Sequence, residues 1–256
     1  MQREELPVSL ARVPPLISTT TSRRPPSILG LGAPFATRWG LVLLFGPLVY
    51  LVYRALKPWV VGLFGWPATI AYPILVFYGP ASVFLCAMFL AHKRLFPDIS
   101  FGGVCSRKRI VYGVGAISVA YLATYGAAFL LGQPREPSMV GLYQFKTNFQ
   151  VAVLIVSLLL LPPIVEELAF RHFILSVLPF NASVWMSRVA VTAMALFFVF
   201  AHSYIYLSTN VLIFVVALIL GFARIRSGGL LLPIGLHAYA IALGLACDQV
   251  AAHLET

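Results

Sequence analysis

Charge is scarce in this 256-residue sequence: 10% of the residues are charged, and only 8 are Asp or Glu. Soluble globular domains carry nearer ~25% charged residues, so the composition excludes an ordinary soluble domain. Cysteine is scarce as well, since only Cys86, Cys105 and Cys247 occur, odd in number and widely spaced. Such a set predicts neither a disulfide framework nor a CxxC metal site. The sequence is instead 60% hydrophobic with a mean hydropathy of +0.92, which indicates an integral membrane protein.

Apolar stretches long enough, or nearly so, to cross a bilayer recur after residue 38. They fall at 39–56, 69–91, 110–132, 148–178, 184–203, 210–225 and 229–247. Backbone groups in hydrocarbon must be hydrogen-bonded internally, so these stretches are expected to be helices. The predicted fold is an all-α polytopic membrane bundle of about seven to eight transmembrane helices, forming a single domain over residues 39–256. An interfacial piece is expected to precede the second span, in the uncharged run from Pro58 to Ala91.

Lysine and arginine gather in the first 38 residues and in two loops. Residues 1–38 lack a sustained apolar period and are predicted to form a flexible basic tail. A targeting segment is the alternative, because the tail is rich in Arg, Ser and Thr, although Glu4 and Glu5 count against it. The tail, segment 92–109 and the 224–226 turn hold most of the loop cations, which predicts that all three are cytoplasmic. Because the cations are spread over loops without a binding fold, no nucleic-acid partner is expected.

Three charged residues interrupt the apolar stretch 148–178: Glu166, Glu167 and Arg171. A charge at membrane depth costs roughly 3 kcal/mol even on lenient scales, so such residues usually mark functional sites. Glu167 and Arg171 are four positions apart in the favourable acid-first order and are predicted to pair. Glu166 points about 100° away around the helix and is predicted to face a cavity. A break is expected at Pro162–Pro163, which would make 163–178 a separate short or re-entrant helix.

Two histidines lie in further apolar stretches. His202 follows Phe198 by four positions, and His237 lies inside the last stretch. A lone buried histidine is more often a hydrogen-bonded core residue, and an EExxxR pattern alone also fits a structural salt bridge. Two glutamates and two histidines on three apolar helices nevertheless favour one shared intramembrane site.

Together these motifs resemble the three-motif signature of the CPBP family, the CAAX-protease and bacteriocin-processing enzymes also called Abi proteins. The signature occupies the region 162–241 of this sequence. The resemblance implies a glutamic intramembrane endopeptidase in which Glu166 is the general base that activates water. It further implies that His202 helps to hold that water and that His237 faces the developing oxyanion.

Supporting roles and a substrate class also follow from the resemblance. Glu167, Arg171 and Phe198 would support the site. The implied partners are membrane lipid and a hydrophobic, membrane-anchored or lipidated peptide or protein substrate. The expected location is the bacterial inner membrane, and the distribution of cations predicts a cytoplasmic amino terminus.

Two positions depart from the family's pattern. Ile241 stands where the third motif usually carries Asn, or sometimes Asp, so an oxyanion donor is missing. Loss of such a donor can cost ~100-fold or more in rate. His172 replaces the Gly that commonly follows the arginine of the first motif, and it is expected at the membrane interface.

Three alternatives stay open. The older description of the family would make Glu166, His202 and His237 zinc ligands, but no HExxH motif is present and we favour no cofactor. A non-catalytic membrane scaffold or immunity protein would keep the charges for helix packing, and Ile241 is its best support. A transporter or proton relay uses intramembrane Glu and His equally well, yet the paired broken helices of that class are not evident.

Overall fold

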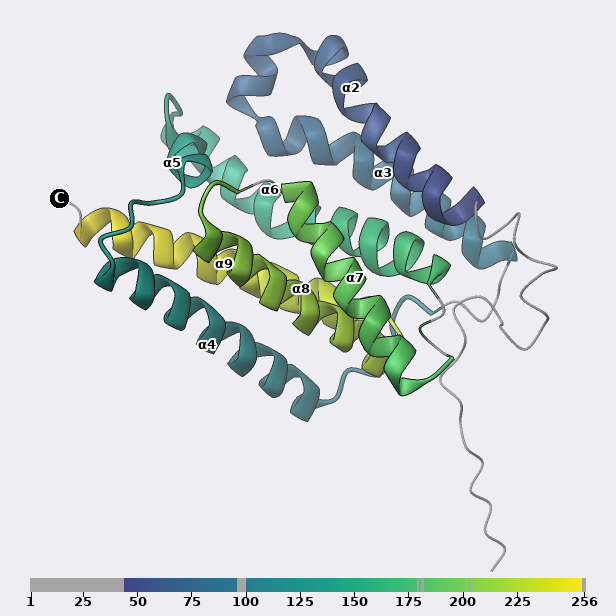
Figure 1. Ribbon diagram of the computed structural model, residues 1–256. Helices are drawn as coiled ribbons and strands as arrows, with labels where there is room; N and C mark the ends of the chain where they lie inside the picture. The colour runs from purple at the N-terminus through teal and green to yellow at the C-terminus, as the bar shows by residue number, and fades with distance from the viewer. Residues whose placement is uncertain (1–43, 96–99, 179, 181, 203, 255–256) are drawn as a thin grey trace, which may run out of the picture.

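The computed structural model describes residues 44–95, 100–178, 180, 182–202 and 204–254, and every regular element within these ranges is a helix. The predicted tail at 1–38 lies outside the described residues. Six helical segments are long and apolar enough to cross a membrane, or seven if the bent α2 is counted as one span. The predicted all-α polytopic bundle is therefore confirmed (Figure 1). The elements in chain order are η2 (Leu44–Leu48), α2 (Val49–Ala71), α3 (Pro73–Leu95), α4 (Arg107–Leu130), α5 (Pro137–Tyr143), α6 (Asn148–Glu166), η3 (Glu167–Ile174), η4 (Leu175–Val177), α7 (Val184–His202), α8 (Leu207–Ser227) and α9 (Leu231–Leu254).

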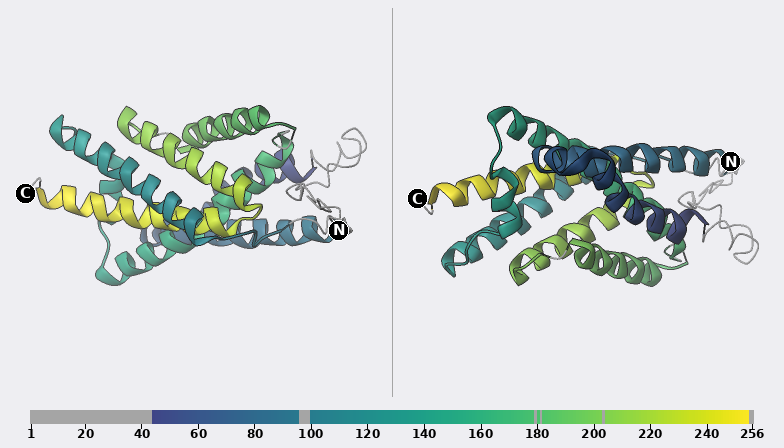
Figure 2. Two further views of the ribbon diagram at one scale, coloured as in Figure 1. Left: turned by 90° about the horizontal axis from the view of Figure 1, so that it is seen from below. Right: turned by 90° about the horizontal axis from the view of Figure 1, so that it is seen from above.

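The segment before α4 and the turn between α8 and α9 meet at one end of the bundle. The Val104 N–H donates to the Ser227 carbonyl over 2.8 Å, and the Leu230 N–H donates to the Phe101 carbonyl over 2.7 Å. Gly103 has φ +67°, and a Cβ there would lie 2.5 Å from the backbone nitrogen of Gly229, so only glycine fits. The two described cation-rich segments thus share one end, as the prediction of a common side requires. Beyond this end α4, α8 and α9 pack against one another (Figure 2).

Helix α2 is sharply bent. The segment Gly46–Val60, which begins in η2, differs in direction by 79° from Gly62–Ala71, and Gly65 has non-helical angles inside α2. Trp59 and Trp66 remain about 70% exposed, at 72% and 71%. The bent second part falls where the interfacial piece is expected, and that assignment stays a prediction.

The expected break at Pro162–Pro163 is wrong. α6 runs through both prolines to Glu166 and continues as the π-helix η3, and Asn148–Val177 forms one 30-residue segment. Proline is tolerated within a membrane helix when neighbouring helices hold the segment, and α6 packs against α3 and α9. The irregularity appears one turn later as π-helical winding, which is rare and frequently found at functional sites.

Glu166 and His202 come together although the chain does not break at the prolines. Helix α7 ends at His202, whose Nε2 lies 3.6 Å from Glu166 Oε2, and the chain continues from there to α8. His237 reaches the same place from the second turn of α9.

His172 is not an interface residue, contrary to the expectation. Its side chain is fully buried, and its Nε2 lies 3.0 Å from Nδ1 of His92, which is also fully buried. Seven of the eight residues of η3 are buried, because this segment lies in the core between α2, α3 and α7. The side chains of η3, including that of His172, therefore face the protein interior, whereas a helix at the surface would expose some of them.

Candidate active site

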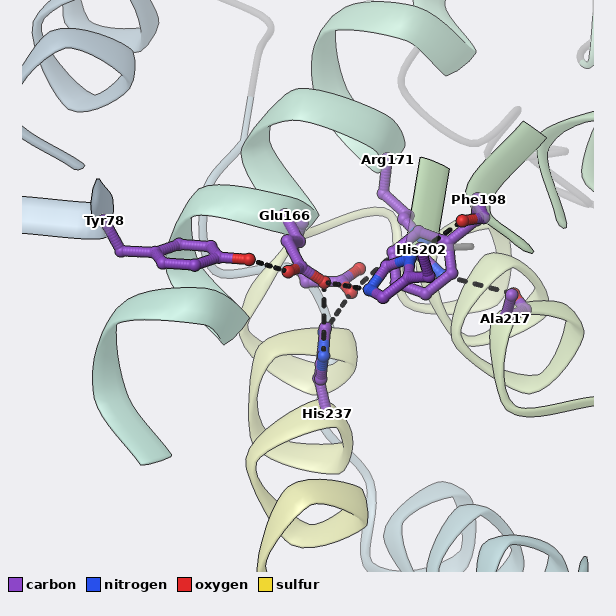
Figure 3. Close-up of polar contacts among 8 residues, drawn as sticks. Tyr78, Glu166, Arg171, Phe198, His202, Ala217 and His237 are labelled. Atoms are coloured by element: carbon purple, nitrogen blue, oxygen red, sulfur yellow. Dashed lines mark hydrogen bonds and ion pairs between the residues drawn. The ribbon is translucent and has the colours of Figure 1, made fainter. Parts of the chain in front are cut away.

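Glu166 lies in the interior of the bundle, where three helices bring polar side chains together (Figure 3). The Tyr78 hydroxyl, from α3, donates to Glu166 Oε1 over 2.8 Å. Glu166 Oε2 faces Nε2 of His202 and Nε2 of His237, each at 3.6 Å. These separations are too long for direct hydrogen bonds, yet short enough for one small group to contact all three atoms. The structure therefore brings together the three residues that the motifs single out.

Two cavities meet at Glu166, which confirms the prediction that this side chain faces a cavity. The smaller one, about 240 Å³, lies among α2, α3, η3 and α7 and contains the cation Arg54. The larger one, about 340 Å³, is mainly apolar and includes Ile241 in its wall. Glu166, Tyr78 and His202 line both cavities.

Glu167 and Arg171 form the predicted ion pair. Glu167 Oε1 lies 3.1 Å from Arg171 Nη1, and both side chains are fully buried. The same oxygen accepts a hydrogen bond from His237 Nδ1 over 2.8 Å. The Arg171 guanidinium also lies 4.3 Å from the centre of the Phe198 ring. Glu167 thus links the arginine of its own segment to the histidine of α9.

A contact of the Nδ1 atom orients the ring of each histidine, His202 and His237. His202 Nδ1 lies 2.8 Å from the Phe198 carbonyl, and His237 Nδ1 lies 2.8 Å from the Glu167 carboxylate. Both partners are acceptors, so both Nδ1 atoms are assigned as donors. Each Nε2 is then the nitrogen directed at Glu166, where a neutral ring accepts a hydrogen bond and a protonated ring donates one.

Two tyrosines belong to the site although no motif marks them. Tyr78 holds Glu166 Oε1, and Tyr204 stacks on His202 with ring centroids 5.8 Å apart. Burial, followed by the negative charges of Glu166 and Glu136, raises the pKa of Tyr204 to about 12. Its hydroxyl therefore stays protonated at neutral pH. A sequence signal for them is weak, because tyrosine is also common in membrane-interface belts.

Glu136 secures the chain that follows α7. Its carboxylate accepts hydrogen bonds from the Ile205 N–H and from the Thr209 hydroxyl, each over 2.9 Å. It lies at the amino-terminal end of α8, where unpaired N–H groups and the helix dipole favour an anion. Glu136 thereby positions the segment that carries Tyr204.

In the part of the chain that the structure describes, no three His, Cys, Asp or Glu side chains are placed to hold a metal ion together.

The fold and this buried cluster define an integral membrane protein with an intramembrane polar site. Residues 148–242 match the family described as type II CAAX prenyl endopeptidase Rce1-like. The chain is also 34% identical over 169 residues to an uncharacterized 24.3 kDa protein of Escherichia coli, an overlap of 66% of this chain and 77% of that relative. No solved structure matches the chain significantly. The chain belongs to the Rce1-like family of type II CAAX prenyl endopeptidases, which confirms the predicted CPBP resemblance.

The family match covers only part of the site. It includes Glu166, His202 and His237, whereas Tyr78 and Arg54 lie before its first residue.

Proposed function

We propose that the protein is a glutamic intramembrane endopeptidase that cleaves a lipidated or otherwise membrane-anchored peptide with water activated by Glu166. The observation that carries the proposal is the convergence of Glu166 Oε2 with two histidine Nε2 atoms, each 3.6 Å away, at the meeting of two cavities. The family's protease activity supports the reaction class. The proposal places the protein in a bacterial inner membrane with a cytoplasmic amino terminus, in keeping with the shared end of its cation-rich segments.

The proposed reaction uses one water and no covalent intermediate. The water between Glu166 and His202 gives a proton to Glu166 Oε2 while its oxygen attacks the peptide carbonyl carbon. The developing oxyanion faces His237 Nε2, and the Glu167 carboxylate orients that ring through Nδ1. Glu166 then returns the proton to the leaving amine as the C–N bond breaks.

The two cavities suggest how the peptide lies across Glu166. A CAAX sequence ends its chain, so the fragment released from it carries a free carboxylate. The smaller cavity offers Arg54 for that anion, and the larger, apolar cavity suits the lipidated side of the cleaved bond. We place the carboxyl-terminal residues of the substrate beside Arg54 on this basis.

Matched peptides test both the activity and this orientation. Purified protein in detergent receives a lipidated CAAX peptide with a free carboxyl terminus or with a carboxamide. The free acid is expected to be cleaved about 10-fold faster, since a charge-assisted contact contributes roughly 1.4 kcal/mol. Arg54→Gln is expected to remove the preference and to leave cleavage of the amide unchanged.

The control is Lys146→Gln, a cation outside the described linings of both cavities, which should keep the preference. Equal rates on acid and amide would overturn the orientation and leave the protease intact. Cleavage abolished by a chelator and restored by zinc would overturn the mechanism through water and protein groups alone. Absence of any cleavage would favour the scaffold.

Ile241→Asn is expected to raise the cleavage rate, up to the ~100-fold that one oxyanion donor contributes. Residue 241 lies in the wall of the larger cavity, so an amide there reaches the space in front of Glu166. Initial rates of the variant, compared with the same-sized Ile241→Leu, measure the effect. An unchanged rate would indicate that a group such as Tyr204 already donates to the oxyanion, and a rate gained equally by Ile241→Leu would exclude a donor effect.

A further inference from the structure

A groove on the outside of the bundle lies between α4, α8 and α9, away from Glu166. Its volume is about 600 Å³, and the residues that line it line neither cavity beside Glu166. Its floor exists because α4 and α9 approach closely at Gly113, where a Cβ would lie 2.5 Å from a methyl carbon of Leu236. Leu232 and Ala223 extend this apolar floor.

Two arginines mark one end of the groove. Arg109 lies in the first turn of α4, and Arg226 lies in the last turn of α8. Both turns adjoin the segments joined by the hydrogen bond from Val104 to Ser227, so the two cations lie at the same end. None of the described residues that line the groove is acidic. The described lining at this end therefore offers two cations beside an apolar trough.

The trough has the length of one membrane leaflet. Along α8 its lining runs from Arg226 to Val215, a separation of eleven positions (226 − 215) or roughly 16 Å at the rise of an α-helix. Half of a bilayer's hydrocarbon core is about 15 Å. Phe222 and Tyr112 lie one turn inside the arginines, and Ala116 lies deeper still. This order matches a leaflet from its surface inward: charge at the headgroups, aromatic side chains at the interface, then an aliphatic wall beside the acyl chains.

We propose that this groove is a binding site for an anionic phospholipid of the leaflet at the cation-rich end. Its phosphate lies between Arg109 and Arg226, and one acyl chain follows α8 toward Val215. A zwitterionic lipid presents the same chain without net charge and binds less tightly. The site is independent of the proposed protease activity, because no part of the argument uses Glu166 or a substrate.

Native mass spectrometry of the full chain in detergent, titrated with phosphatidylglycerol or phosphatidylcholine, tests the site. Phosphatidylglycerol is expected to bind at least 10-fold more tightly and to raise Tm, since it binds only the folded state. Arg109→Gln together with Arg226→Gln is expected to weaken its binding about 30-fold, as two cations each contribute about 5-fold near an anionic headgroup. Ala116→Trp is expected to abolish binding while both charges remain.

The matched control is Arg94→Gln with Arg188→Gln, which removes the same charge from exposed positions at the ends of α3 and α7 outside the described groove lining. It is expected to keep the affinity. Equal weakening in the control, or equal binding of the two lipids, would overturn the proposal in favour of general surface attraction. Binding of glycerol phosphate that Ala116→Trp leaves intact would overturn the lipid assignment. Displacement of phosphatidylglycerol by a lipidated peptide would show that the groove binds substrate instead. Loss of dimers in the arginine double variant would show that it binds a second copy of the chain.

Discussion

Glu166→Gln is expected to lower the rate of peptide cleavage by at least ~100-fold, the usual contribution of a general base, while the protein stays folded in the membrane. Glutamine keeps the shape of the side chain, and its amide oxygen can still accept from Tyr78, but it cannot take a proton from water. Oε2 makes no direct hydrogen bond to a described residue, so the substitution removes few contacts. Initial rates of cleavage and Tm, measured on the same preparation, separate the two effects.

Two further variants show how much the neighbours of Glu166 contribute to the cleavage rate. His202→Ala is expected to match Glu166→Gln, since it removes the second group that holds the water. Tyr78→Phe removes only the donor to Oε1 and is expected to lower kcat about 10-fold with KM unchanged, because Tyr78 positions the carboxylate. Full activity in both Glu166→Gln and His202→Ala would reject the enzyme in favour of a scaffold.

Arg171→Met is expected to destabilise the folded protein by about 3–5 kcal/mol, the cost typical of breaking a buried ion pair. Methionine approximates the aliphatic part of the arginine, so the loss arises mainly from the charge. Glu167 keeps only its hydrogen bond from His237 and remains an anion in a fully buried position. Unfolding in a denaturant titration, or Tm in detergent, measures the loss.

The double variant Glu167→Gln with Arg171→Met provides the control. Removing the second charge should recover most of the stability, because no unpaired ion then remains in the core. A double variant as unstable as Arg171→Met would show that guanidinium packing on Phe198, and not charge pairing, is the main contribution. An unaltered Tm in Arg171→Met would contradict the role of the pair altogether.

Much of the site could be predicted, because helical spacing and the cost of burying charge depend on residues that are close in the sequence. Four-residue spacing pairs Glu167 with Arg171, and the neighbouring Glu166 is thereby left to face a cavity. Hydropathy likewise identifies the spans, since lipid demands apolar helices of nearly fixed length. The shared site of Glu166, His202 and His237 required the further assumption that buried polar residues converge.

The remaining features depend on tertiary packing. The prolines of α6 predict a break in an isolated helix, but neighbouring helices hold the chain together and shift the irregularity to η3. The burial of His172 follows from that π-helical winding and from its partner His92, 80 positions away. Tyr78 and Glu136 escape sequence analysis because their partners lie 88 and about 70 positions away, with no motif to join them.

The backbone hydrogen bond from the Leu230 N–H to the Phe101 carbonyl has a consequence for biosynthesis. Its two residues are separated by 129 positions (230 − 101), so the carbonyl emerges from the ribosome long before its donor. His237 follows only seven residues after that donor, in the last described helix. A chain still being inserted therefore holds Glu166 and His202 without their third partner. Under the proposed function, the protease cannot attack neighbouring membrane proteins until the chain has been inserted as far as His237.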